Sequence, residues 1–152
     1  MHRLLQNYLD ETEAAGNTKQ FRQALSHFAA ALDLPKFAYI AIPSMAGRQF
    51  RLITNYAEPW RQHYVDQRYE TCDPIVLQSI LQRSSFGWGR GFGVNDPFCL
   101  RFFDEAASFG ICYGYTIPLH HWHGRFAALT FATDREPLAF LQTTRRHALA
   151  LE

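Results

Sequence analysis

The residues best suited to hold a ligand lie between Tyr56 and Asp73. If a helix begins near Pro59, Trp60 and Tyr64 share one face, with Tyr56 just ahead of the first turn. One indole and two phenols combine large apolar faces with hydrogen-bond donors, which suits a molecule with an apolar tail and a carbonyl-rich head. A helix that simply packs its aromatic side chains on a sheet would show the same spacing. However, each polar tip needs a partner, whereas Leu and Ile would build a simpler core.

Asp73 is the second candidate. An aspartate directly before Pro74 is typical of a helix N-cap, and that role alone would explain it. A carboxylate turned inward would instead accept a hydrogen bond from an N–H donor such as a ligand amide. In that case Asp73 and Trp60 together could hold an amide N–H and a carbonyl oxygen of one head group.

Thr130 is the third candidate, in the expected strand 125–133. Strand alternation places Phe126, Ala128, Thr130 and Ala132 on one face. The small side chains of this face leave volume above the sheet, as a ligand cavity requires. A closely packed helix would explain them equally well.

An enzyme is the main rival to a binding domain. Cys72, Cys112 and the histidines His121 and His123 are of the types that act as nucleophiles, bases or metal ligands. The sequence has no nucleophile elbow, no glycine-rich phosphate loop and no HExxH motif. The two histidines would splay apart across a hairpin turn, which disfavours a metal site. We therefore expect neither catalysis nor a metal or other cofactor.

Composition and charge narrow the remaining classes. The 152 residues suit one domain, 47% of them are hydrophobic, and the net charge of +1 offers no basic surface for nucleic acid. No apolar run reaches membrane-spanning length, and no signal peptide is recognisable. Three cysteines without CxxC spacing argue against a disulfide framework, so a reduced, cytoplasmic protein is expected.

The candidate residues must be positioned by an ordered set of helices and strands. Helices are expected from Thr18 towards Pro35, from Pro59 to about Arg68, from Pro74 to about Leu81, from Pro97 to Gly110, and after Pro137. Strands are expected over 37–42, 49–56, 112–119 and 125–133, with turns at 44–47 and 121–124. The glycine-rich segment 84–93 is expected to be a loop that supplies one short strand. Adjacent strand pairs favour a central antiparallel sheet of about five strands, with helices on both faces.

Several motifs in order resemble one known family. The stretch NYAEPWRQHYVDQRYETCDPIV, followed by FGWG, RFFDEAASFGI and YGYTIPLHHWHGRFAALTFA, is similar to the autoinducer-binding domain of LuxR-type transcription factors, closest to the TraR-like branch. The resemblance covers roughly residues 18–150. It implies a PAS/GAF-like α-β-α sandwich that buries an N-acyl-homoserine lactone between sheet and helices.

The resemblance also implies roles for individual residues. Trp60 corresponds to the donor to the lactone carbonyl, Asp73 to the acceptor of the amide N–H, and Tyr56 and Thr130 to partners of the acyl carbonyl. Tyr64 and Ile75 correspond to positions beside the ligand, and Arg61 to one that reaches a 3-oxo group through water in some relatives. The wall around the lactone ring corresponds to Trp88, Phe102, Phe103, Ala106 and Ile111.

The family's partners follow from the same resemblance. We expect a homodimer that senses an acyl-homoserine lactone and has no membrane contact. Relatives carry a C-terminal helix-turn-helix domain for DNA, whereas we expect residues 1–152 to form a single autoinducer-binding domain without one. A truncated receptor that inactivates a full-length partner by heterodimerisation, or an enzyme that processes the lactone, are the alternatives.

Overall fold

Strand β5 (Phe126–Thr133) is the centre of the fold, and all eight of its residues are buried. In the computed structural model, which describes residues 17–31, 33–42, 50–93, 95–120 and 126–136, five strands form one sheet in the order β2-β1-β5-β4-β3. The other strands are β1 (Lys36–Ile42), β2 (Arg51–Thr54), β3 (Phe86–Trp88) and β4 (Tyr113–His120), and every neighbouring pair is antiparallel. The prediction of a five-stranded antiparallel sheet is confirmed.

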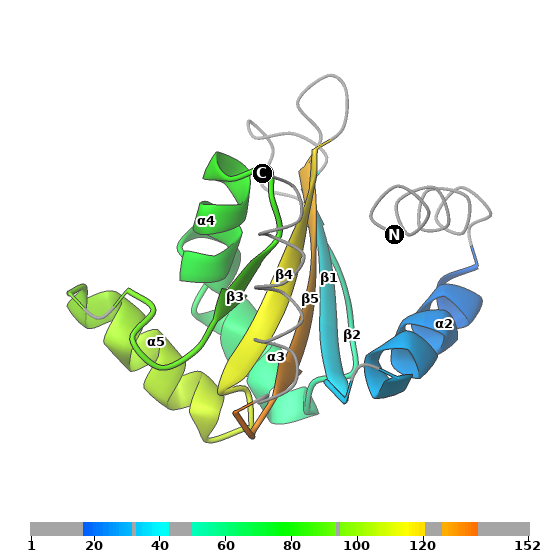
Figure 1. Ribbon diagram of the computed structural model, residues 1–152, viewed down its shortest axis with the longest axis horizontal. Coiled ribbons are helices and arrows are strands. Elements are labelled where there is room, and N and C mark those ends of the chain that lie inside the picture. The colour runs from blue at the N-terminus through cyan, green and yellow to red at the C-terminus, as the bar shows by residue number, and fades with distance from the viewer. Residues whose placement is uncertain (1–16, 32, 43–49, 94, 121–125, 137–152) are drawn as a thin grey trace, which may run out of the picture.

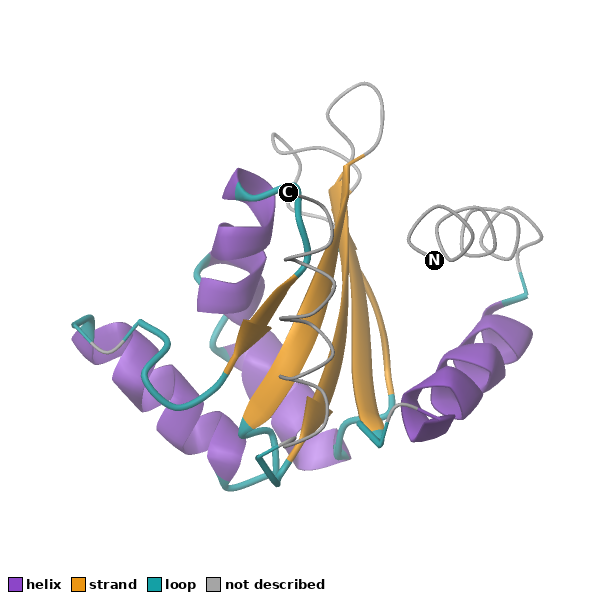
Figure 2. Cartoon of the chain, viewed as in Figure 1, coloured by secondary structure: helices purple, strands orange, loops and turns teal. Residues whose placement is uncertain are grey.

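Helices cover both faces of this sheet. Helix α2 (Thr18–Ala31) lies on one side, and α3 (Glu58–Asp66), α4 (Pro74–Leu81) and α5 (Pro97–Ala107) lie on the other (Figure 1, Figure 2). The predicted apolar face of α2, with Phe21, Leu25 and Phe28, packs on the sheet residues that point towards it. The described part of the chain is therefore an α-β-α sandwich, as predicted. The sheet therefore has a hydrophobic core on each face, and the core under α3, α4 and α5 contains the candidate residues.

Proline and aspartate define the helix starts on the candidate-site side. Proline occupies the first turn of α3, α4 and α5, where its missing N–H leaves no hydrogen bond unmade. Asp73 and Asp96 cap α4 and α5, with side-chain oxygens that accept backbone N–H groups of the first turn. These Asp-Pro pairs fix where each helix begins and so fix the side chains that follow.

Some predicted boundaries were too wide. Strand β2 is limited to Arg51–Thr54, and beyond it the Asn55 side chain accepts the N–H of Phe37 and donates to the carbonyl of Pro35. Helix α3 ends at Asp66, since Arg68 has a positive φ of 55°. The predicted turns at 44–47 and 121–124 and the helix after Pro137 lie outside the described residues.

Candidate ligand-binding cavity

A cavity lies between the sheet and helices α3, α4 and α5, and eleven residues predicted from the sequence line it. The centre of a water molecule can occupy about 60 Å³ of this space, several times what one water needs. The lining residues that the sequence predicted are Tyr56, Trp60, Tyr64, Asp73, Ile75, Trp88, Phe102, Phe103, Ala106, Ile111 and Thr130. Ala128, which the strand alternation placed on the same face as Thr130, lines it too, and four residues that the sequence did not predict are Ala38, Ile40, Leu52 and Val76. The structure thus brings together residues from four strands and three helices.

Two of the three polar-tipped aromatic side chains have no protein partner in the described residues. Tyr64 donates its hydroxyl to Asp73 Oδ2 at 2.9 Å. The Tyr56 hydroxyl and the Trp60 indole N–H meet no acceptor in the described ranges, although both side chains line the cavity. Burial, and then the nearby Asp73 carboxylate, raise the pKa of the Tyr56 phenol well above its usual value, so it stays a neutral donor.

Asp73 serves both roles that the sequence left open. Its Oδ1 caps α4 by accepting the N–H groups of Ile75 at 2.8 Å and Val76 at 3.4 Å. Its Oδ2 accepts the Tyr64 hydroxyl and retains room for a second donor, because a carboxylate oxygen has two lone pairs. Burial raises the pKa of the Asp73 carboxyl to about 6, although the three hydrogen bonds each lower it. The ionised Asp73 carboxylate has no cationic partner among these contacts, so it is available to accept a hydrogen bond from an N–H donor in the cavity.

A chain of hydrogen bonds sets the direction of the Thr130 hydroxyl. Trp88 Nε1 donates to Thr116 Oγ1 at 3.0 Å, and Thr116 Oγ1 lies 2.9 Å from Thr130 Oγ1. An indole N–H can only donate, so Thr116 accepts there. Thr116 is fully buried, and in the described residues its own hydrogen has only Thr130 as acceptor. Thr116 therefore donates to Thr130, which leaves the Thr130 hydrogen free to donate into the cavity. Thr116 could not be predicted from the local sequence, because its role depends on the register of β4 against β5.

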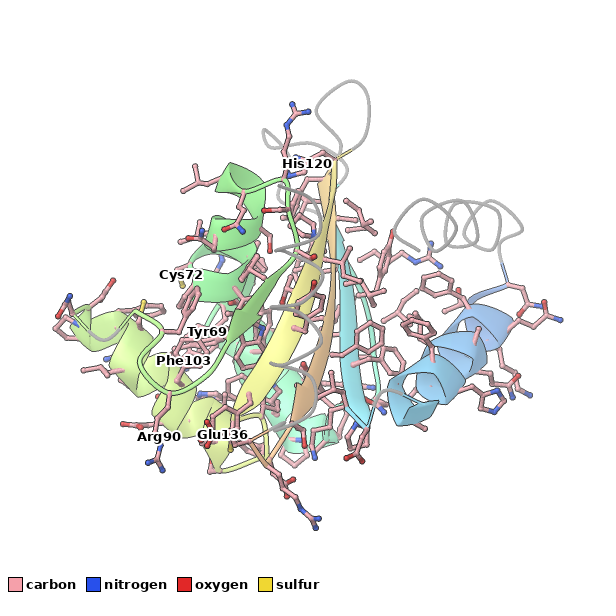
Figure 3. The ribbon with its side chains drawn as sticks, in the orientation of Figure 1. Tyr69, Cys72, Arg90, Phe103, His120 and Glu136 are labelled. Carbon is pink, nitrogen blue, oxygen red and sulfur yellow. The ribbon has the colours of Figure 1, made fainter. Side chains whose placement is uncertain are left out.

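Aromatic side chains form one end wall of the cavity. Trp60 contacts Phe102 with ring centroids 5.8 Å apart, and Trp88 contacts Phe103 at the same distance. Gly114 lets Trp88 lie flat on β4, since a Cβ at that position would come within 2.2 Å of the indole. Figure 3 shows Phe103 on the side of the sheet that α5 covers.

A polar cluster holds this wall from outside. Glu105 Oε2 of α5 accepts the Tyr69 hydroxyl at 2.5 Å and lies 2.8 Å from His63 Nε2 of α3. Tyr69 belongs to a short 3-10 helix (Tyr69–Thr71), and its ring contacts Trp60 at 6.1 Å. Hydrogen bonds from Tyr69 and His63 lower the pKa of Glu105. The cluster therefore joins α3 to α5 behind Trp60 without reaching the cavity.

Arg61 is placed differently from the family expectation. Its guanidinium pairs with Glu58 one helical turn earlier, and it is not a lining residue. In this structure Arg61 therefore contributes to the outer surface of α3.

The groups that suggested an enzyme do not form a reactive centre in the described ranges. Cys72, Cys99 and Cys112 are free thiols, and none of them lines the cavity. Within the same ranges no group of three or more His, Cys, Asp or Glu side chains could hold a metal ion. His121 and His123 lie outside the described residues. No helix in the described part of the chain is long and apolar enough to cross a bilayer.

Comparisons with known proteins agree with this geometry. The TraR transcriptional activator of Rhizobium radiobacter is 29% identical over 140 residues, which cover 86% of this chain and 57% of TraR. The putative HTH-type regulator y4qH of Sinorhizobium fredii is 29% identical over 153 residues, which cover 91% of this chain and 47% of y4qH. The chain thus spans about half the length of these relatives.

A solved structure and a family profile complete the comparison. The N-acylhomoserine lactone dependent LuxR family transcription factor CepR2 from Burkholderia cenocepacia superposes with a TM-score of 0.69 at 25% identity, covering 82% of this chain and 72% of CepR2. The sequence profile of the autoinducer binding domain matches residues 17–152. This chain therefore belongs to the autoinducer-binding domain family of LuxR-type quorum-sensing regulators.

Proposed function

We propose that the cavity binds an N-acyl-homoserine lactone and does not alter it chemically. Trp60 donates to the lactone carbonyl, Asp73 accepts the amide N–H, and Tyr56 and Thr130 donate to the acyl carbonyl. The acyl chain lies on the apolar remainder of the cavity. Family membership and the N-acylhomoserine lactone dependence of CepR2 support this assignment.

The single observation that carries the proposal is the set of unused polar groups around the cavity. Trp60, Tyr56 and Thr130 each present a donor without a partner in the described residues, and Asp73 presents an acceptor with a free lone pair. An acyl-homoserine lactone offers the complement, two carbonyl oxygens and one N–H. A purely apolar ligand would leave these buried groups unpaired, at about 1–3 kcal/mol each.

The wider role is proposed from the relatives. They are transcriptional regulators, which implies a receptor and not an enzyme. We propose that the lactone completes the core under α3–α5, and that the stabilised domain dimerises within a cytoplasmic regulator. With a net charge of +1, this segment itself is not the part that would bind DNA phosphates.

Two single-hydroxyl deletions separate binding from stability. Tyr56→Phe removes a donor that lines the cavity and has no described partner, so it should leave the melting temperature of the empty protein unchanged. It should weaken lactone binding about fivefold, the equivalent of one neutral hydrogen bond of about 1 kcal/mol. Tyr69→Phe removes the bond to Glu105 outside the cavity, so it should lower the melting temperature and leave affinity within about twofold. Calorimetric titration and thermal melting of both variants measure these effects.

Equal affinity losses in the two variants would contradict the placement of the head group.

The same titrated samples distinguish a receptor from a lactone-processing enzyme. The lactone should be recovered intact by mass spectrometry after incubation with the protein. Ring opening at catalytic rates would overturn the receptor proposal.

A further inference from the structure

The floor of the cavity is built from rows of side chains that run across the strands, on the face of the sheet that α3, α4 and α5 cover. Because β1, β5 and β4 pair in antiparallel register, Ala38, Thr130 and Thr116 align in one row, the hydroxyl row. The next row along the sheet, the alanine row, contains Ile40, Ala128 and Pro118, with Leu52 of β2 beside Ile40. The third row, the end row, contains Ile42, Phe126 and His120.

The cavity extends over the first two rows and not over the third. Thr130 and Ala38 of the hydroxyl row line the cavity, as do Ile40, Ala128 and Leu52 of the alanine row. No member of the end row lines it. Space therefore opens over the small Ala128 side chain and stops before the end row.

The end row is held in place by packing and hydrogen bonds. Phe126 is 5% exposed and clusters with Ile40, Val76 and Ala128. Its ring lies 5.4 Å from the ring of His120. His120 Nε2 lies 3.1 Å from the Ser79 carbonyl and 3.3 Å from the Gln82 carbonyl, at the end of α4. Figure 3 shows His120 at the end of β4 close to α4. This part of the wall is consequently tied to both the sheet and the helix layer.

The distance between the rows sets the length of acyl chain that the cavity can hold. Successive rows are two residues apart, or about 6.8 Å, so the hydroxyl and end rows are separated by about 13.5 Å. A carbon–carbon contact of about 4 Å with the end row leaves roughly 9.5 Å for the acyl chain. Bonds of about 1.5 Å give an extended chain about 1.3 Å per carbon, so roughly seven carbons fit.

We propose that the cavity selects straight acyl chains of about six to eight carbons, with Ala128 providing the space for the chain and Phe126 closing its end. This inference rests on the proposed lactone function and adds the class of signal. Neither residue needs to hydrogen-bond the ligand, because selection acts through the length of apolar contact and through steric exclusion beyond it.

The test is a titration of the full chain with unsubstituted N-acyl-homoserine lactones from butanoyl to tetradecanoyl. Affinity should be highest for hexanoyl or octanoyl and at least about tenfold weaker for dodecanoyl, since longer chains meet Phe126. Where the empty protein is poorly soluble, the yield of soluble protein from cultures supplied with each lactone gives the same ranking.

Variants on the opposite face of β5 provide matched controls. Ala128→Val adds two methyl groups inside the cavity and should shift the optimum to a chain about two carbons shorter. Phe126→Leu shortens the wall and should shift it to a longer chain. Ala127→Val and Phe131→Leu make the same changes on the α2 side of the strand, where both residues are buried. They should lower stability without changing the order of preference.

The possible results separate this inference from the function on which it rests. A preference for dodecanoyl or longer chains would show that the tail leaves past Leu52, and would overturn the length assignment alone. An optimum that stays fixed in both Ala128→Val and Phe126→Leu would do the same. Failure of every lactone to bind would overturn the proposed function as well.

Discussion

Asp73→Asn is expected to stabilise the empty domain and weaken ligand binding. Because burial raises the pKa of the Asp73 carboxyl from 3.8 to about 6, ionisation of this group destabilises the folded state. A difference of this size corresponds to about 3 kcal/mol at neutral pH. Asparagine still caps α4 through its side-chain oxygen and carries no charge, so the free energy of unfolding at about pH 7 should rise by roughly 2–3 kcal/mol.

The pH dependence follows from the same shift. A carboxyl whose pKa is raised on folding contributes most stability below its unfolded pKa, and this stability is lost as the pH rises through about 6. The wild-type domain should therefore lose stability relative to Asp73→Asn between about pH 4 and pH 6.5, as measured by urea unfolding.

Ligand affinity should change in the opposite direction. The ligand N–H bonds to the ionised carboxylate, so wild-type affinity should be about tenfold weaker at pH 5 than at pH 7. Asp73→Asn should weaken binding about 10- to 100-fold, as expected for loss of a charge-assisted hydrogen bond, and should remove this pH dependence.

Asp96→Asn is the matched control for the Asp73 variant. Asp96 also precedes a proline and caps a helix, with Oδ1 2.8 Å from the Phe98 N–H, but it lies in an exposed position outside the cavity. Its replacement should change neither affinity nor stability by more than about 0.5 kcal/mol. Unchanged affinity in Asp73→Asn would show that Asp73 is only a helix cap.

Gly114→Ala is expected to remove Trp88 from the cavity wall. A Cβ at Gly114 would lie 2.2 Å and 2.5 Å from two indole carbons of Trp88 and 2.6 Å from the Phe131 carbonyl oxygen. The Phe131 carbonyl belongs to the paired strand β5 and cannot move away without breaking the sheet. The Trp88 indole must therefore move, and it loses its hydrogen bond to Thr116. We expect a loss of about 2–3 kcal/mol of stability, a melting temperature lower by about 5–10 °C, and lactone binding at least tenfold weaker.

Gly87→Ala tests whether this effect is specific. Gly87 lies on β3 beside Trp88, and the nearest atom to an added Cβ is the Gly114 carbonyl oxygen at 3.8 Å, an ordinary contact. This variant should melt within about 2 °C of the wild type and bind lactone normally. Equal behaviour of the two alanine variants would show that the position of the Trp88 indole against Gly114 is not needed for binding.

Local sequence patterns were sufficient for much of the fold and for part of the site. The Asp-Pro pairs fixed the starts of α4 and α5, because capping and the proline ring act within one helical turn. The alternation in β5 placed Ala128 and Thr130 on one face, since side chains alternate strictly along a strand. The aromatic residues of α3 followed from their helical spacing and those of α5 from the family resemblance, and the structure brings both sets around one cavity.

The residues that the sequence analysis missed depend on contacts between distant segments. Ala38 and Ile40 line the cavity only because β1 pairs with β5 in the register Ala38–Thr130 and Ile40–Ala128. A shift of one residue would turn both to the other face. Thr116 gains its role in the same way, from the pairing of β4 with β5 and from the seat of Trp88. No local pattern specifies such registers.

The central claim is that this cavity is the binding site of an acyl-homoserine lactone. Thermal melting of the full chain with increasing amounts of the straight-chain lactones from hexanoyl to dodecanoyl tests it most directly, with the ring-opened acyl-homoserines as matched ligands. At about 100 times its dissociation constant, the best lactone should add about 2.7 kcal/mol of stability and raise the melting temperature by roughly 5–10 °C. A melting temperature that no lactone raises, or that the ring-opened compounds raise equally, would contradict the claim.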